Sequence, residues 1–323
     1  ELSRAVSLSS QAANLFASRH SLQFIHEFRD NLYNRGIQYF SREHENFPAL
    51  LKLIPDPPVG IFCIGNLPSE NFLKIAIIGA RKCSEYGLLT ARTFAKPLAQ
   101  AGVVVVSGMA RGIDSMAHRG AIGGGGKTIA VLGCGADVCY PSENLNLREE
   151  IIHNGCVISE YPPGTTPLPA FFPARNRIIS GLSHGVIVVE AGKKSGTLIT
   201  VDQALDQGRE VFAVPGSVSS KLSEGTNQLI KDGAIFVSDY TDVLSAFGIN
   251  SQNEIEKQKK IIQKNILAPD EKQVYDNLNF EPVGIDALME STGFDPGKTL
   301  LLCAQLEIKG LLRKLPGSRF IKN

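Results

Sequence analysis

Seven apolar runs, most of them rich in β-branched residues, limit the folds open to this chain more than any other feature. They are Ile75–Gly79, Val103–Ser107, Thr128–Gly133, Val157–Glu160, Val186–Glu190, Val211–Pro215 and Ala234–Val237. Segments with helical spacing, such as Gly87–Gln100 and Thr197–Gln207, separate most of these runs. Strands that are apolar throughout and alternate with helices are typical of a parallel sheet covered on both faces. We therefore expect an α/β fold with a doubly wound, mostly parallel sheet over residues 73–248.

The segments on either side of this Rossmann-like domain differ from it in composition. Residues 1–72 start with apolar positions at helical spacing and continue as a proline-rich lead-in arm with a short strand at Ile61–Gly65. Residues 249–265 are rich in Gln, Glu, Lys and Asn, which predicts a linker. Residues 266–323 show three short helical segments and then two small strands around Pro316 and Gly317. This order predicts an N-terminal helical region and a C-terminal winged-helix domain.

The overall charge of +1 gives the chain no general attraction for polyanions, so nucleic-acid binding must depend on where cations cluster. The six cysteines are scattered through strand-like segments, which favours free thiols in a reducing compartment over disulfides. Cys134 and Cys139 lack a second pair of ligands, so no metal site is expected. No apolar run is long enough to span a bilayer. We expect a cytoplasmic protein without membrane insertion.

Two motifs resemble nucleotide-binding loops but lack essential parts of them. Gly126, Lys127 and Thr128 match the end of a P-loop, yet this segment follows a helix and leads into a strand, the reverse of the required order. Gly133 and Gly135 begin a dinucleotide motif, but its third glycine is replaced and no helix follows. We therefore expect neither ATP nor NAD, and no other cofactor.

Ligands of open α/β sheets bind outside the carboxyl ends of the strands, so the loops after the strands hold the candidate residues. These loops carry seven cations: Arg81, Lys82, Arg111, Arg175, Arg177, Lys193 and Lys194. Small and hydroxyl residues beside them are Gly79, Ser107, Gly108, Ser195, Gly196 and Thr197. Phe172 offers a stacking surface for a base, and Asn176 lies between the two arginines before a helix near Ile178. Several phosphate sites at one edge favour a polyphosphate strand over a small anion.

Each of these residues also has a structural interpretation. Arg175 and Arg177 can pair internally with Glu160 or Glu190, and a Lys–Lys pair is usually a solvated surface. Phe171 and Phe172 are, taken singly, more often core residues. His118, on the helix after Asp114, is more often a packing residue than a catalyst. It is the coincidence of the cations at one edge that favours a binding site.

Long motifs across the α/β domain resemble the DprA/Smf family. They include Gly79-Ala80-Arg81, Ser107–Asp114, Tyr140-Pro141, Ser159–Pro162, Phe172–Ile179, Ser195–Thr200, Val214–Gly216 and Gly225–Asn227, in the family's order. The resemblance implies single-stranded DNA binding, protection of incoming DNA in natural transformation, and loading of the recombinase RecA. It also implies an N-terminal helical arm and a winged-helix tail. The glycine-rich insertion Gly123–Gly126 departs from the family pattern, and we expect it only to lengthen a connector.

A homodimer is expected through the last strand of the sheet and the helix before it. Ala234–Val237 is a predicted edge strand, and edge strands with apolar side chains invite coverage by another surface. Asn227, Ile230 and Phe236 are the candidate interface residues. The alternative, that these side chains pack on their own sheet, is equally compatible with the residues. The family resemblance decides between the two, because DprA proteins dimerise through this region.

Two other functions compete with this hypothesis. Phosphoribohydrolases of the cytokinin-activating type have a loop like the one at Ser195–Thr197, but their essential glutamate falls where this chain has Thr200. Without that carboxylate no general acid or base is in place, and we expect no enzymatic activity. A sequence-specific regulator would need a base-reading helix in the winged domain. The segment Pro296–Lys309 is rich in leucine and poor in such side chains, which favours a protein–protein role.

Overall fold

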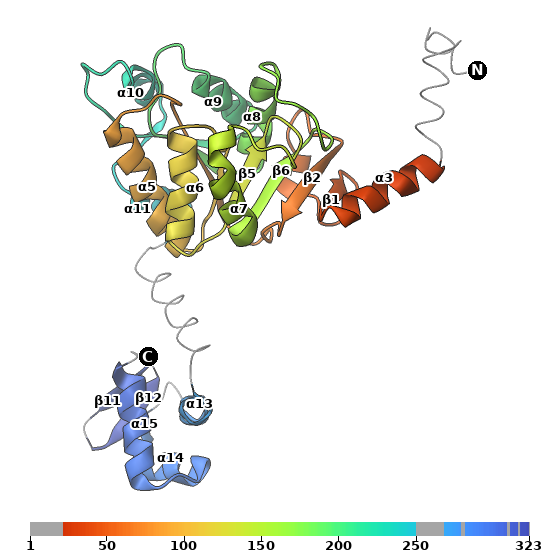
Figure 1. Cartoon of the computed structure of the whole chain (residues 1–323). Helices are drawn as coiled ribbons and strands as arrows, with labels where there is room; N and C mark the ends of the chain where they lie inside the picture. The colour runs from red at the N-terminus through yellow and green to blue at the C-terminus, as the bar shows by residue number, and fades with distance from the viewer. Residues whose placement is uncertain (1–21, 250–267, 279–281, 309–310, 316, 323) are drawn as a thin grey trace, which may run out of the picture. The chain divides into compact units, whose positions relative to one another are not determined.

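The computed structural model describes residues 22–249, 268–278, 282–308, 311–315 and 317–322 (Figure 1). It divides into two compact units, Glu1–Phe247 and Gly248–Asn323. The predictions for residues 1–21 and for the linker from 250 onward lie outside the described residues. Of the N-terminal helical region, the structure describes one helix, α3 (Leu22–Asn34).

The described part of the first unit is built on a nine-stranded sheet with the order β1-β2-β6-β5-β4-β3-β7-β8-β9. The strands are β1 (Gln38–Ser41), β2 (Gly60–Gly65), β3 (Lys74–Ile78), β4 (Val104–Ser107), β5 (Thr128–Leu132), β6 (Gly155–Ser159), β7 (Gly185–Val188), β8 (Glu210–Ala213) and β9 (Ile235–Phe236). From β3 to β9 every pairing is parallel. The predicted doubly wound, mostly parallel sheet is therefore confirmed.

The lead-in arm joins this sheet instead of standing apart from it. β2 pairs antiparallel with β6, and β1 pairs antiparallel with β2. Ile61 and Cys63 of β2 are fully buried in the same core as β3 and β5. The sequence indicated the strand at 61–65 but neither its place in the sheet nor β1, because both depend on pairing with residues far along the chain.

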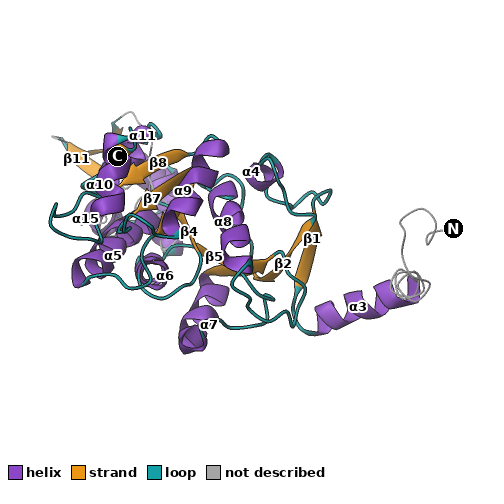
Figure 2. Ribbon diagram, turned by 90° about the horizontal axis from the view of Figure 1, so that it is seen from above, coloured by secondary structure: helices purple, strands orange, loops and turns teal. Residues whose placement is uncertain are grey.

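Helices cover both faces of the sheet (Figures 1 and 2). α5 (Glu85–Gln100), α6 (Ile113–Gly123) and α7 (Leu145–Asn154) lie on one face, and the short α4 (Ala49–Lys52), α8 (Phe171–Gly181) and α9 (Thr197–Asp206) lie on the other. α10 (Glu224–Lys231) and α11 (Tyr240–Ala246) complete the unit. α5 shows why such helices form: the Ser84 hydroxyl caps its first turn by accepting from Gly87 N–H.

The start of α8 differs from the prediction. The sequence placed Phe171–Arg177 in a loop before a helix, whereas these residues form the first two turns of α8. Pro173 is the third residue of α8 and does not break it. A proline in the first turn is compatible with a helix, since the first N–H groups of a helix have no partner within it. The side chains of this segment therefore project from a helix.

The second unit is a small winged-helix fold, as predicted. Its elements are α13 (Pro269–Asp276), β10 (Val283–Gly284), α14 (Ile285–Thr292), α15 (Pro296–Ile308), β11 (Leu312–Leu315) and β12 (Arg319–Lys322). The described strands form a sheet with the order β10-β12-β11. Val274, Leu288, Leu306 and Phe320 are buried in its core. α15 exposes Leu300 and Leu301.

Candidate nucleic-acid interface

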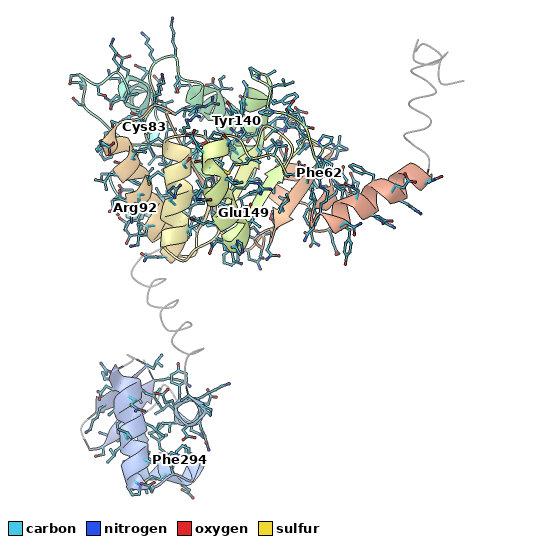
Figure 3. All side chains as sticks on the ribbon, viewed as in Figure 1. Phe62, Cys83, Arg92, Tyr140, Glu149 and Phe294 are labelled. Carbon is cyan, nitrogen blue, oxygen red and sulfur yellow. The ribbon has the colours of Figure 1, made fainter. Side chains whose placement is uncertain are left out.

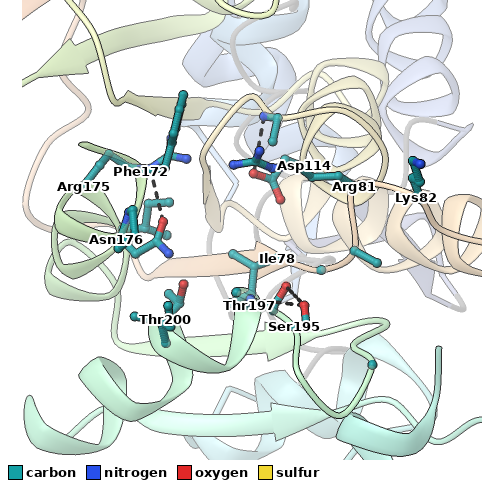
Figure 4. A pocket seen from close by; sticks show the side chains of 18 of the residues that line it. Ile78, Arg81, Lys82, Asp114, Phe172, Arg175, Asn176, Ser195, Thr197 and Thr200 are labelled. Atoms are coloured by element: carbon teal, nitrogen blue, oxygen red, sulfur yellow. Dashed lines mark hydrogen bonds between the residues drawn. The ribbon is translucent and has the colours of Figure 1, made fainter. Parts of the chain in front are cut away.

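A pocket of about 780 Å³ lies at the carboxyl ends of β3, β4 and β7 (Figure 4). This is where the strand order reverses direction, because β3 has β4 on one side and β7 on the other. Ten of the predicted site residues line the pocket or its walls: Gly79, Arg81, Lys82, Phe172, Arg175, Asn176, Lys194, Ser195, Gly196 and Thr197. A smaller hollow beside it is lined by Gly108, Arg111, Tyr140 and Pro141, together with Arg81, Phe172 and Arg175.

Glycines hold the two cationic loops of the pocket against each other. Gly112 has a φ of +76°, and a Cβ there would lie 2.5 Å from the carbonyl oxygen of Ala80. A Cβ on Gly108 would lie 2.6 Å from Nη1 of Arg175. A side chain at Gly112 would push its loop away from the loop at Ala80, and one at Gly108 would displace the Arg175 guanidinium, so the two glycines fix where these cations lie.

Arg175 is buried, with 4% of its surface exposed, and it forms part of the pocket floor. Its Nη1 donates to the carbonyls of Gly108 (2.8 Å) and Val131. Its Nη2 donates to no other residue in the described parts of the chain. Burial lowers the pKa of Arg175 to about 10, and the Asp114 carboxylate opposes that shift. Arg175 is therefore a structural support that also turns one charged group toward the pocket.

Asp114 lies opposite Arg175 and also lines the pocket (Figure 4). Its Oδ2 accepts from the N–H groups of Gly108 (3.2 Å) and Ala110 (3.4 Å). Burial raises the pKa of this carboxyl, while Arg175 and the two N–H groups oppose the shift. Asp114 belongs to the Ser107–Asp114 motif, but its place in the pocket was not predicted from the sequence.

An aromatic and cationic stack stands at the pocket wall. The Arg81 guanidinium lies 5.1 Å from the centre of the Phe172 ring, and the Tyr140 ring centre lies 5.4 Å from that of Phe172. Tyr140 is 40% exposed. Phe171 instead stacks on Tyr161, with ring centres 4.1 Å apart. Tyr140 was not predicted as a pocket residue from the sequence. Its position beside Pro141 in a family motif was the one indication of such a role.

The loop before α9 forms the opposite wall. The Ser195 hydroxyl accepts from Thr197 N–H at 3.2 Å, which orders the turn. Gly196 is the N-cap residue of α9 and provides no side-chain cap. The first two N–H groups of this helix are bonded to Ser195, because Leu198 N–H donates to the Ser195 carbonyl, so the helix offers the pocket the positive end of its dipole more than free donors. Lys194 lines the pocket at this wall, and Thr200 lies one turn further along α9.

Three predicted site residues are not brought into the pocket lining. The buried Ser107 hydroxyl donates to the carbonyl of Ile77. Arg177 pairs with Asp56 (3.0 Å) and Glu160 (2.7 Å), which is the internal pairing that the sequence left open. Lys193 is exposed beside Lys194 but lies outside the lining.

Two buried groups have structural partners instead of a role in the pocket. Glu190 accepts from the N–H and hydroxyl of Ser84, so it anchors the start of α5 and does not pair with Arg175. His118 Nδ1 lies 2.7 Å from the Thr128 hydroxyl, which itself donates to Val105 O. Nδ1 must therefore be the donor. Burial lowers the pKa of His118 to about 3, so its ring is neutral.

Comparison with known proteins identifies the family. A model of the DNA recombination-mediator protein A family matches residues 38–248. The chain belongs to this family. A model of the DprA winged helix domain also matches, over residues 263–318. The resemblance to DprA and Smf proteins that the sequence motifs indicated is thus confirmed.

Known members of the DprA family resemble much of the chain. The DNA processing protein DprA of Streptococcus pneumoniae is 44% identical over 230 residues, 68% of this chain and 81% of the relative. Protein Smf of Escherichia coli is 36% identical over 283 residues, 85% of this chain and 75% of the relative. The structure of DNA processing protein A from Helicobacter pylori, described for its single-stranded DNA binding mode, is 33% identical with a TM-score of 0.56. That match covers 69% of this chain and 96% of the relative.

The three candidate dimer residues of this DprA-family chain lie in different environments. Phe236, on the edge strand β9, is 52% exposed. Ile230 is half-buried, while its neighbour Leu229 packs against the core. Asn227 bonds through its amide to both the N–H and the carbonyl of Gly216. Asn227 is therefore held within its own unit, and the exposed apolar surface belongs to Phe236 and Ile235.

Two further findings concern metals and membranes. In the described residues, no group of three or more His, Cys, Asp or Glu side chains is placed to hold a metal ion. None of the described helices has the length and apolar character needed to cross a bilayer.

Proposed function

We propose that this chain binds single-stranded DNA at the strand-end pocket, with one unpaired base inside and phosphates on the surrounding loops. The observation that carries the proposal is the stack of Arg81, Phe172 and Tyr140 beside the free Nη2 of Arg175. An aromatic face stacks on any base, and a guanidinium binds phosphate or a base edge. The family's DNA-processing relatives, one of them described for single-stranded DNA binding, support it.

The size of the pocket favours a single strand over a duplex. A volume of about 780 Å³ is in the range of small-ligand sites and suits one nucleotide. A base in a duplex reaches such a pocket only after unpairing and unstacking, which costs a few kcal/mol. A single strand does not have to be unpaired, so it binds more tightly at equal length.

We further propose that the chain is not an enzyme. Asp114 is held by two N–H groups and Arg175, and Thr200 occupies the position of the glutamate in phosphoribohydrolases. His118 is buried and Glu190 is bonded to Ser84. None of these groups is placed as a free general acid or base. Release of base from nucleoside monophosphates by the pure protein, abolished in a Thr200→Ala variant, would favour the hydrolase alternative instead.

The remaining functions come from the family. We propose that the chain acts in the cytoplasm during natural transformation and recombination. There it would protect incoming single strands, and as a homodimer load RecA onto them. The six cysteines, all free in the structure, are compatible with a reducing compartment.

A binding titration tests the central proposal. Fluorescence anisotropy with labelled oligo(dT) and with a duplex of equal length should show tighter binding of the single strand. With six phosphate contacts, the slope of log affinity against log salt should be about −4, at ~0.7 per contact. Equal affinity for the two DNAs would contradict the proposal.

A further inference from the structure

A second group of cations lies on the outer surface of α5 and α6, away from the pocket. Arg92 and Lys96 on α5, Arg119 on α6, and Lys127 after the loop 123–126 are all exposed. We call these four residues the α5–α6 basic surface. In the described parts of the chain, none of the four forms an ion pair. The Lys127 ammonium instead lies 4.9 Å from the centre of the Phe72 ring.

Close packing of the two helices brings these cations together. α5 and α6 lie side by side in both views of the fold, and Figure 3 shows Arg92 on α5. A Cβ on Gly120 of α6 would lie 2.7 Å from Cβ of Ala95 and 3.2 Å from Cα of Arg92. Gly120 of α6 therefore lies against Arg92 of α5, and the exposed Arg119 precedes Gly120 in the same helix. A Cβ on Gly124 would lie 2.5 Å from the carbonyl of Lys96, so the loop lies beside Lys96.

The four cations outnumber the acidic residues of α5 and α6. The two helices carry two acidic residues, Glu85 in the first turn of α5 and Asp114, which is buried toward the pocket. On the adjacent α7, Glu149 pairs with Arg148 at 2.7 Å and Glu150 is exposed. On α11, Asp242 accepts from the N–H groups of Ser238 and Asp239. A chain with a net charge of only +1 therefore has a locally basic face here.

The loop 123–126 completes the surface. The N–H groups of Gly124, Gly125 and Gly126 donate to carbonyls in the last turns of α6. Because these carbonyls are hydrogen-bonded, they repel an approaching anion less than free carbonyls would. Gly123 and Gly125 are exposed with no atom within 4 Å of a Cβ position. A loop without side chains leaves the backbone beside Lys96 and Lys127 open to a bulky polyanion.

We propose that the α5–α6 basic surface binds the phosphates of the DNA strand as it leaves the pocket, an inference that rests on the proposed function. α5 and α6 begin directly after the loops that hold Arg81, Lys82 and Arg111, so the cations continue from the pocket along the helices. The 16 residues of α5 span about 24 Å at ~1.5 Å per residue. An extended single strand lying along this length would bring several successive phosphates to the α5–α6 basic surface. The strand is single here because it continues from an unpaired base.

The experiment compares short and long oligo(dT), of about six and twenty nucleotides, on full-length protein. The variant Arg92→Gln/Lys96→Gln/Arg119→Gln removes three charges and keeps good helix formers. The control Arg29→Gln/Arg42→Gln/Lys52→Gln removes three exposed cations near the β1 edge of the sheet. In the first variant, affinity for the long strand should fall on the order of tenfold. Its salt slope should become shallower by about 2, at ~0.7 per lost contact, while short-strand affinity matches the control.

Each other outcome has a defined meaning. Long-strand affinity equal to that of the control variant would overturn the proposal, as would equal losses for both lengths. A loss confined to duplex DNA would assign the surface to another ligand and also overturn it. If wild-type protein binds neither length, the proposed function itself fails. If the short strand binds, and the gain in affinity with length is the same in wild type and in the first variant, the proposed function stands and only the proposal for the α5–α6 basic surface fails.

Discussion

Beside the pocket, Arg111 donates from Nε and Nη2 to the two carboxylate oxygens of Glu143, at 2.7 and 2.6 Å. Glu143 thus presents the same pair of acceptors that a phosphate would. The hydrogen bonds from Arg111 lower the pKa of Glu143, and the same bonds raise the pKa of Arg111. A DNA phosphate must displace the carboxylate before it can bind Arg111.

The variant Glu143→Gln should therefore bind single-stranded oligo(dT) several-fold more tightly than wild type at low salt. Removing the charge frees Arg111 and removes a repulsion, and screening by salt should reduce the gain. Anisotropy titrations at two salt concentrations measure both effects. Glu43→Gln, an exposed acid near the β1 edge, is the control. Unchanged affinity would show that Arg111 contacts no phosphate.

The sequence predicts the same role for Arg81 and Arg175, but in the structure the two side chains have different environments. Arg81 is exposed and lies over Phe172, whereas Arg175 supports two carbonyls in the interior. Arg81→Ala should weaken DNA binding and leave the free energy of unfolding unchanged. Arg175→Ala should also destabilise the fold, by about 3 kcal/mol, since two buried carbonyls lose a charged donor. Urea unfolding and binding isotherms on both variants check this; equal stabilities would contradict it.

At the level of secondary-structure elements, His118 connects α6 to β5 through the Thr128 hydroxyl. The folded-state pKa of about 3 is below the ordinary value of 6.5, so the unfolded chain binds the extra proton first as the pH falls. The contribution of the neutral His118 ring to the free energy of unfolding is fully present above pH 6.5. It is lost between pH 6.5 and about 3, by up to about 1.4 kcal/mol per pH unit.

The measurement compares urea unfolding of wild type and His118→Gln from pH 7 to pH 4. The wild type should lose stability more steeply below pH 6.5 than the variant, because glutamine does not titrate. The carboxylates titrate in both proteins and cancel in the comparison. Parallel curves would mean that His118 is protonated in the folded state.

The elements that were predicted correctly are those whose own residues, without distant partners, determine the secondary structure. Continuous runs such as Val104–Ser107 are buried on both sides and have no alternative to a central strand. β1 was missed because its residues show no clear alternation between buried and exposed side chains. It is a strand only through its pairing with β2. Tyr140 and Asp114 belong to the pocket through tertiary neighbours, the Phe172 ring and the Arg175 guanidinium, which the local sequence does not show. Whether a cation faces solvent or an internal partner, as for Arg177, depends on contacts such as Asp56 that no local pattern contains.

For the whole molecule, the exposed edge strand β9 is the surface on which the predicted homodimer can be tested. Phe236 and Ile235 are both exposed there. Phe236→Glu should convert a dimer to a monomer at micromolar concentration, because a charge in an apolar interface is costly to bury. Light scattering measures the mass, and Leu205→Glu, another exposed apolar position, is the control. A monomeric wild type, or a dimer unaffected by the change, would contradict the prediction.

The antiparallel pairing of β2 with β6 has a consequence for synthesis on the ribosome. Phe62 is made about a hundred residues before its partner Ser159. At ~5–20 residues per second, the strand waits for on the order of 5–20 seconds for the residues that will cover it. During that time the apolar Gly60–Gly65 segment is available to chaperones or to neighbouring nascent chains. The edge of the sheet that holds the earliest strands therefore cannot form until β6 has been made.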